Sequence, residues 1–275
     1  MKSLNNKVAV VTGAGSGIGR AIAIELAQHG CVLALSDINE IALQETKQLI
    51  LDAKSNTTTH LQTLDVANKQ AVFEYARNVN ADLGCVDLII NNAGVALSSG
   101  VDETKREDFE WLMNINFWGV INGCEAFLPY LKQSQDAHIV NISSVFGMIA
   151  IPRQSCYNAA KFAVRGYTEA LRQEMGMKYP HISVSCVHPG GIATDIARNA
   201  RVSEGEDISE LTASFDKLAQ TTPQKAAKII VAGIKKNKSR VMVGWDAHVI
   251  HALYRLLGIH YIGLTQWLAK RLNYQ

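Results

Sequence analysis

Short apolar runs alternate with amphipathic segments along most of the chain. The first run, at residues 8–11, is uninterrupted and rich in β-branched side chains, which is typical of a strand buried on both faces. The next segment repeats its apolar side chains at helical spacing, with Ile18, Ile22 and Leu26 on one side, and Gly30 ends it. Further strands are predicted at residues 31–36, 58–64, 86–90, 138–143, 181–187 and 240–243.

Helices are predicted between these strands, at about residues 20–29, 39–54, 69–81, 107–133, 157–178 and 223–236. A capping box at residues 104–107 is expected to open the helix at 107–133. This alternation predicts an α/β fold with a doubly wound parallel sheet and helices on both faces. No linker rich in Pro, Gly or Ser divides the chain, so residues 1–275 are expected to form a single domain.

Two segments depart from this alternation. Residues 195–222 are polar and weakly periodic, and they are interpreted as a mobile lid over the substrate or, alternatively, as a solvated helical insert. Residues 246–273 form an apolar segment that is expected to be helical, and its part from 256 to 269 has no charged side chain. That part is too short to span a bilayer, which takes about 20 residues. We expect it to line a pocket or a subunit interface, with contact to a membrane surface as the less favoured alternative.

A glycine-rich turn joins the first strand to the first helix. Gly13, Gly17 and Gly19 allow a tight turn and close approach of a ligand, and the helix N-terminus offers N–H groups to a pyrophosphate. Asp37 follows the second strand, about 20 residues further on, as in dinucleotide-binding units. Its carboxylate can bind both hydroxyls of an adenosine ribose and would repel a 2′-phosphate, which favours NAD over NADP. The alternative role for Asp37 is the N-cap of the next helix.

A tyrosine and a lysine lie four residues apart in a segment that is expected to be helical. Tyr157 and Lys161 therefore share one helix face. An ammonium group beside a phenol favours the phenolate and lowers the pKa of the phenol, so the pair is a candidate acid/base device. A pair of this kind is also common on solvated helix surfaces.

Several candidate residues follow the ends of different strands. In parallel sheets, ligands bind outside the carboxyl ends of the strands, so these side chains are expected at one edge. The residues are Gly13, Asp37, Asn92, Ser144 and Pro189.

Composition excludes several classes of function. The net charge is +2 and no basic cluster is interleaved with aromatics, so no nucleic-acid partner is expected. The five cysteines are scattered singly, without the spacing of a metal site, and reduced thiols in a cytoplasmic protein are expected. The apolar run at residues 8–11 is too short for a signal peptide.

Five motifs occur in order along the chain: Thr12-Gly-Ala-Gly-Ser-Gly-Ile-Gly19, Asn91-Asn-Ala-Gly94, Ser144, Tyr157-Asn-Ala-Ala-Lys161 and Pro189-Gly190. Together they resemble the motif set of the short-chain dehydrogenase/reductase family, of the Tyr-x-x-x-Lys type with a TGxxxGIG cofactor motif. The resemblance covers about residues 6–195 and extends more loosely to the seventh strand. It implies a Rossmann-type sheet of seven strands, a nicotinamide cofactor and a homodimer or homotetramer.

The resemblance also implies catalytic roles. Tyr157 resembles the acid/base of the family, and Lys161 resembles the lysine that lowers the tyrosine pKa and binds the nicotinamide ribose. Ser144 resembles the serine that holds the substrate oxygen, whereas Ser143 is one residue too far from the tyrosine. Asn116 resembles the asparagine that anchors a water for proton relay.

The implied cofactor contacts fall into a pyrophosphate loop, adenine contacts, a ribose floor and carboxamide contacts. In that order they are Gly13, Ser16, Gly17, Ile18 and Gly19; Asp65 and Val66; Asn92, Ala93 and Gly94; and Pro189, Gly190, Ile192 and Thr194, together with Asp37, Tyr157 and Lys161.

The implied function is hydride transfer between a nicotinamide cofactor and an alcohol or ketone, with NAD preferred and no metal. The substrate is expected to be lipophilic, because apolar residues follow the strand ends where a pocket would form. These residues are Val95, Leu97, Phe146, Met148, Ile149 and Ile151. The alternatives are a redox-neutral enzyme on the same fold, such as an epimerase or dehydratase, and a nicotinamide-binding protein at a membrane surface.

Overall fold

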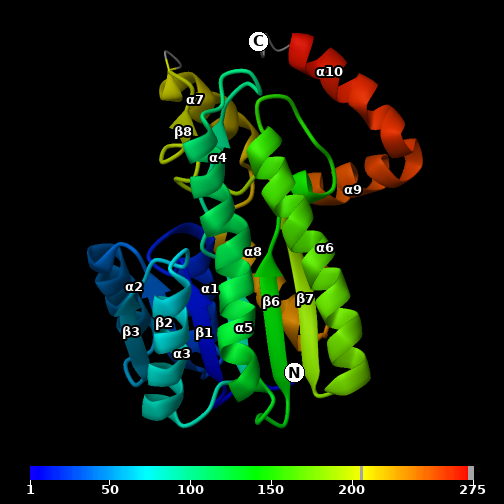
Figure 1. Cartoon of the computed structure of the whole chain (residues 1–275). Coiled ribbons are helices and arrows are strands. Elements are labelled where there is room, and N and C mark those ends of the chain that lie inside the picture. The colour runs from blue at the N-terminus through cyan, green and yellow to red at the C-terminus, as the bar shows by residue number, and fades with distance from the viewer. Residues whose placement is uncertain (205–206, 272–275) are drawn as a thin grey trace.

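The computed structural model describes residues 1–204 and 207–271. Seven parallel strands form the central sheet in the order β3-β2-β1-β4-β6-β7-β9 (Figure 1). They are β1 (Val8–Thr12), β2 (Val32–Asp37), β3 (Thr59–Thr63), β4 (Leu88–Asn91), β6 (Ala137–Ile142), β7 (Ile182–Pro189) and β9 (Arg240–Val243). The order reverses beside β1, so the predicted doubly wound sheet is confirmed, with shifts of one or two residues at most strand ends.

Helices cover both faces of the sheet. One layer contains α1 (Gly17–Gln28), α2 (Glu40–Ala53) and α8 (Pro223–Lys235), and the other contains α3 (Lys69–Leu83), α5 (Gly119–Leu131) and α6 (Ser155–Lys178). Val11 of β1 belongs to the apolar cluster under α1, whereas its neighbour Val10 belongs to the cluster under α5. This alternation explains why strands buried on both faces are continuous apolar runs.

The single helix predicted at 107–133 is interrupted. It consists of α4 (Arg106–Met113), a π-helical turn η1 (Asn114–Trp118) and then α5, and the Gly119 N–H bonds back to the Asn114 carbonyl. The predicted capping box is wrong, because the Thr104 hydroxyl donates to the Gly100 carbonyl at 2.7 Å and Lys105 takes the N-cap position. Asn68 is the N-cap of α3, and its side chain accepts from the N–H of Ala71.

The remaining elements lie beyond the carboxyl edge of the sheet. They are β5 (Leu97–Ser98) and β8 (Arg201–Val202), which pair in parallel; the turns η2 (Val145–Gly147) and η3 (Gly258–His260); and α7 (Ile208–Leu218), α9 (Trp245–Leu257) and α10 (Tyr261–Arg271). Figure 1 shows α10 projecting away from the sheet past α9. Within the described residues, no helix is long and apolar enough to cross a membrane.

Candidate active site

The glycine-rich turn between β1 and α1 forms a cradle that only small residues fit. Gly13 has φ +65°, and a Cβ there would lie 2.8 Å from the Cα of Ala93. A Cβ at Gly19 would lie 2.0 Å from the Gly13 carbonyl oxygen. Ser16 is the N-cap of α1 but makes no side-chain bond to the helix, which leaves that end open toward the loop. The turn therefore fits a pyrophosphate, which a helix N-terminus binds through backbone N–H groups.

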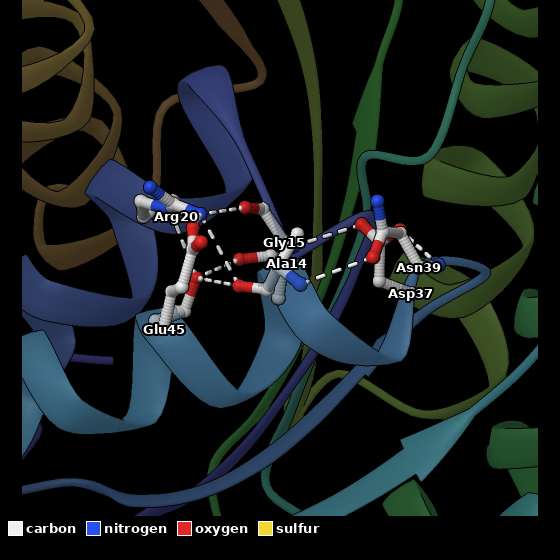
Figure 2. Close-up of polar contacts among 8 residues, drawn as sticks. Ala14, Gly15, Arg20, Asp37, Asn39 and Glu45 are labelled. Carbon is white, nitrogen blue, oxygen red and sulfur yellow. Dashed lines mark hydrogen bonds and ion pairs between the residues drawn. The ribbon is translucent and has the colours of Figure 1, made fainter.

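Asp37, at the end of β2, is bound to this turn. Figure 2 shows its carboxylate between the N–H of Gly15, at 2.8 Å, and the N–H of Asn39, at 2.9 Å. The N-cap of α2 is Asn39, whose side chain accepts from the N–H of Ala42. The alternative role of Asp37 as that N-cap is therefore wrong.

Arg20 of α1 crosses to α2 and was not singled out from the sequence. Its guanidinium donates to the Gly15 carbonyl, to the Thr46 hydroxyl at 2.9 Å and to the Glu45 carboxylate at 2.9 Å (Figure 2). It therefore braces the glycine-rich turn against α2. Its position directly after Gly19 is the signal that could have identified it.

The candidate ribose floor is joined to the end of β1. The Asn92 amide donates to the carbonyls of Thr12 and Gly13 at 3.0 and 3.1 Å. The N–H groups of Asn92 and Ala93 both donate to the Thr12 hydroxyl, at 3.0 and 3.1 Å. These bonds fix the loop after β4 against the glycine-rich turn.

The two candidate adenine contacts follow β3 and differ in exposure. Asp65 is exposed and accepts from the N–H of Ala67 at 2.9 Å. Val66 is buried, and its carbonyl accepts from the side chain of Asn122 at 3.0 Å. Their contact with a cofactor stays a prediction.

Tyr157 and Lys161 lie in the first turns of α6, at the carboxyl edge of the sheet. The Tyr157 ring packs edge-on against Phe146, with 6.3 Å between ring centroids. Lys161 is only 4% exposed, and its ammonium donates to the Ile142 carbonyl at 3.2 Å. The Lys161 nitrogen lies 5.5 Å from the centroid of the Tyr157 ring, so the two do not form a solvated surface pair.

Burial dominates the acidity of this pair. It lowers the pKa of Lys161 to about 8. It also raises the pKa of Tyr157 to about 12, although a hydrogen bond with Ser144 acts in the opposite direction. The expected lowering of the phenol pKa by the lysine is therefore not found in the protein alone, because Lys161 is buried and Tyr157 is half-buried, and the loss of water disfavours both charged forms.

The two serines after β6 have different environments. The Ser143 hydroxyl is buried and donates to the Lys161 carbonyl at 2.8 Å, which is a structural bond. The Ser144 hydroxyl accepts from the N–H of Phe146 at 3.1 Å and hydrogen-bonds Tyr157. His188 of β7 contacts the Ser144 carbonyl at 2.9 Å through Nδ1. Of the two serines, Ser144 is therefore the one placed beside the phenol.

Asn116 is fully buried in the π-helical turn, whereas Asn114 is exposed. Its amide accepts from the N–H of Val95 and donates to the Val95 carbonyl, both at 2.8 Å. It therefore joins the helix to the loop after β4, and its role in a proton relay stays a prediction. A Cβ on Gly94 would lie 3.2 Å from Asn116 Oδ1 and 3.5 Å from Lys161 Nζ, so Gly94 lies close to both candidate catalytic side chains.

Asn158 lies between Tyr157 and Lys161 in sequence, and the resemblance implies no role for it. Its side chain donates to the carbonyls of Phe146 and Ile149, at 3.0 and 3.2 Å, and accepts from the N–H of Ile151 at 3.2 Å. It thus fixes the loop that follows Ser144. A buried amide inside a helix is the signal for such a role.

The loop after β7 is held by the start of α9. The Gly191 N–H donates to the Asp246 carboxylate at 2.6 Å, and the Gly190 N–H donates to the Val243 carbonyl at 2.9 Å. Ile192 is buried, and Thr194 lies against the glycine-rich turn, since a Cβ at Gly17 would be 3.1 Å from its methyl group. The role of Asp246 was missed, because a carboxylate at a helix start also suits an ordinary helix end.

The segment predicted as a lid lies against α4 and the loop after β4. The Arg201 guanidinium pairs with Asp108 at 2.6 Å and lies 3.8 Å from the centroid of the Trp111 ring. Lys105 pairs with Glu204 at 3.3 Å. Motion of this segment stays a prediction.

The candidate pocket residues are only partly accessible. Leu97 and Met148 are buried, whereas Val95, Phe146 and Ile151 are half-buried. In residues 1–204 and 207–271, no three His, Cys, Asp or Glu side chains gather in a way that could hold a metal ion.

Comparison with known proteins identifies relatives along nearly the whole chain. A family model described as short chain dehydrogenase matches residues 7–205. "Putative oxidoreductase SadH" of Mycobacterium tuberculosis is 49% identical over 262 residues, covering 95% of this chain and 94% of that protein. A 3-ketodihydrosphingosine reductase of Bacteroides thetaiotaomicron is 34% identical, covering 72% of this chain and 68% of its own. A short chain dehydrogenase/reductase of Burkholderia phymatum, solved with NAD, superposes with a TM-score of 0.84 at 30% identity, covering 93% and 94% of the two chains.

Proposed function

The chain belongs to the short-chain dehydrogenase family and is a nicotinamide-dependent oxidoreductase, and from this premise we propose that it interconverts a lipophilic alcohol and ketone with NAD as preferred cofactor. The observation that carries the proposal is the position of Tyr157, Lys161 and Ser144 together at the carboxyl edge of the sheet. A buried ammonium beside a phenol and a serine hydroxyl suits proton transfer to or from a substrate oxygen.

In the proposed mechanism, Tyr157 gives its proton to the carbonyl oxygen of a ketone, or takes the proton of an alcohol. The Ser144 hydroxyl holds that oxygen, and the charge of Lys161 favours the phenolate that remains. Asn116 anchors the water through which the proton is replaced. When bound, the nicotinamide accepts or supplies the hydride.

The cofactor is proposed to lie along the carboxyl edge. The glycine-rich turn with Gly13, Ser16, Gly17, Ile18 and Gly19 holds the pyrophosphate, and the other contacts are Asp65, Val66, Asn92, Ala93, Gly94, Pro189, Gly190, Ile192 and Thr194. The preference for NAD is supported by Asp37, whose negative charge would repel a 2′-phosphate. The guanidinium of Arg20 is already bonded to the Glu45 carboxylate and the Gly15 carbonyl, so it does not offset the negative charge of Asp37 by attracting a 2′-phosphate.

The lipophilic substrate is supported by the half-buried side chains of Val95, Phe146 and Ile151 around the site. A relative is named for the reduction of a keto group on dihydrosphingosine. We also propose that residues 195–222 cover the substrate, and that the enzyme is a cytoplasmic homodimer or homotetramer.

The decisive variant is Tyr157→Phe, with Tyr167→Phe on the same helix as its control. We expect the first to abolish turnover while NADH binding, followed by fluorescence, stays within about threefold, because only a proton-transfer group is lost. The control should keep activity. A panel of alcohols and ketones, assayed with NAD and NADP by the absorbance of reduced nicotinamide, tests the substrate class and the cofactor. Full activity of Tyr157→Phe would refute the mechanism, and a wild-type preference for NADPH would refute the role of Asp37.

A further inference from the structure

We propose that α9 and α10 form a docking surface for an anionic lipid bilayer, independently of the reaction that the enzyme catalyses. We call this face the C-terminal surface and define it as the exposed side chains of residues 249–271. Its apolar members are Val249, Leu253, Leu256, Ile259, Ile262, Leu264, Trp267 and Leu268. Leu256 is 83% exposed and Ile259 is 69% exposed, and exposed apolar side chains gathered on one segment mark an interaction site.

The fold holds α10 away from the body of the protein. Figure 1 shows α10 extending beyond α9, and α10 packs mainly on α9 and η3. Tyr261 at its start is buried and accepts a hydrogen bond from the N–H of Ala150 at 3.0 Å. The ring of Tyr261 also packs edge-on against Tyr254, at 6.1 Å between centroids. The segment is therefore tied at its base and exposed along its length.

Charge indicates which partner the surface fits. Residues 247–275 contain three cations, Arg255, Lys270 and Arg271, and no Asp or Glu. The whole chain has 27 Lys and Arg against 25 Asp and Glu, so the rest of the chain is net negative. All three cations are exposed, and Arg271 lies over the ring of Trp267 at 5.2 Å. Apolar side chains flanked by cations and tryptophan match the interface of an anionic bilayer.

The same distribution argues against a second copy of the chain. An isologous dimer through this surface would bring the same patch of both copies together, with cations on each side and no acid to pair with them. A span across the bilayer is also excluded for α10, because its 11 residues extend only about 16 Å against the ~30 Å hydrocarbon core. The helix is long enough to lie in the plane of the interface.

The test is co-sedimentation of the full-length protein with phosphatidylcholine vesicles, with and without phosphatidylglycerol. We expect binding to the anionic vesicles only, weakened by added salt. Lys270→Gln with Arg271→Gln should weaken it about 25-fold, because each cation near such a surface contributes about fivefold. Ile259→Glu should abolish it, whereas Met177→Glu, an equally exposed site on α6, should not change it.

Sedimentation velocity of the same variants distinguishes docking to a bilayer from contact with a second copy of the chain. The proposal requires Ile259→Glu to keep the oligomeric state of the wild type while it loses vesicle binding. If Ile259→Glu converts an oligomer to a smaller species, the C-terminal surface is a contact between copies of the chain, and the proposal is overturned. Equal binding to neutral and anionic vesicles, or no binding by the wild type, would overturn it as well.

Discussion

Replacement of Lys161 by methionine is expected to stabilise the cofactor-free protein while it abolishes activity. Lys161 is 4% exposed, and burial lowers its pKa from 10.5 to about 8. One pKa unit corresponds to about 1.4 kcal/mol, so a charged Lys161 costs the folded state about 3 kcal/mol at neutral pH. Methionine has a similar shape without the charge, but it loses the hydrogen bond to the Ile142 carbonyl, which is worth about 1 kcal/mol. We expect a net gain of about 2 kcal/mol in the free energy of unfolding.

The pH dependence of the free energy of unfolding shows whether the gain comes from removal of the buried ammonium or from better packing of methionine. Between the folded pKa of about 8 and the unfolded value of 10.5, the unfolded wild type holds more protons, so its stability rises with pH. The advantage of Lys161→Met is therefore largest below about pH 8 and shrinks toward pH 10.5. Urea unfolding at about pH 7 and about pH 9.5 measures this difference.

The control is Lys178→Met, which removes an exposed lysine near the end of the same helix. Its effect on the free energy of unfolding should be below about 0.5 kcal/mol, because the side chain is exposed. A less stable Lys161→Met at neutral pH, or a difference that does not change with pH, would show that burial of the ammonium does not destabilise the fold.

Three further predictions concern the glycine-rich turn, the loop after Ser144 and the buried core of the sheet. Gly19→Ala places a Cβ 2.0 Å from a backbone carbonyl oxygen, so it should lower the free energy of unfolding by at least about 2 kcal/mol and abolish NADH binding. Its control, Gly166→Ala, places a Cβ in open space on α6 and should raise the free energy of unfolding by about 1 kcal/mol in urea unfolding. Asn158→Leu should lower kcat at least about tenfold with little change in NADH binding, because the loop after Ser144 loses three hydrogen bonds; an unchanged kcat would contradict this. Burial lowers the pKa of His138 to about 3, so the free energy of unfolding of the wild type should fall as pH falls below 6.5. His138→Gln should reduce the slope of that dependence by up to about 1.4 kcal/mol per pH unit. Equal slopes in the two proteins would show that buried His138 does not cause the loss of stability.

The strands were predictable because burial on both faces leaves a local trace. Residues 8–11 and 88–90 are continuous apolar runs, and both lie in the centre of the sheet. The π-helical turn at Asn114–Trp118 leaves no such trace in the local sequence. It occurs where Asn116 forms hydrogen bonds to Val95, in a loop that is distant along the chain. The false capping box at Thr104 has a local cause, because its hydroxyl donates to the Gly100 carbonyl in the preceding loop instead.

The gathering of the candidate site could be predicted, but the hydrogen bonds that support it could not. Tyr157 and Lys161 share a helix face by spacing alone, whereas Arg20, Asn158 and Asp246 act through contacts that only the folded chain creates. The direction of the Tyr157 pKa shift was wrong for a related reason. Spacing shows which charge is near, but not how much water the fold removes.

The acidity of the pair also bears on the direction of the chemistry. With a pKa of about 12 for Tyr157 and about 8 for Lys161, the protein alone at neutral pH holds a neutral phenol and a predominantly charged lysine. A neutral phenol carries the proton that reduction of a ketone needs, although its raised pKa makes it a weaker acid. Removal of a proton from an alcohol first requires the phenolate, which burial opposes and nearby positive charge favours. The ammonium of Lys161 therefore favours the phenolate in both directions, because the phenolate forms when Tyr157 gives its proton to a ketone and is needed before Tyr157 takes the proton of an alcohol.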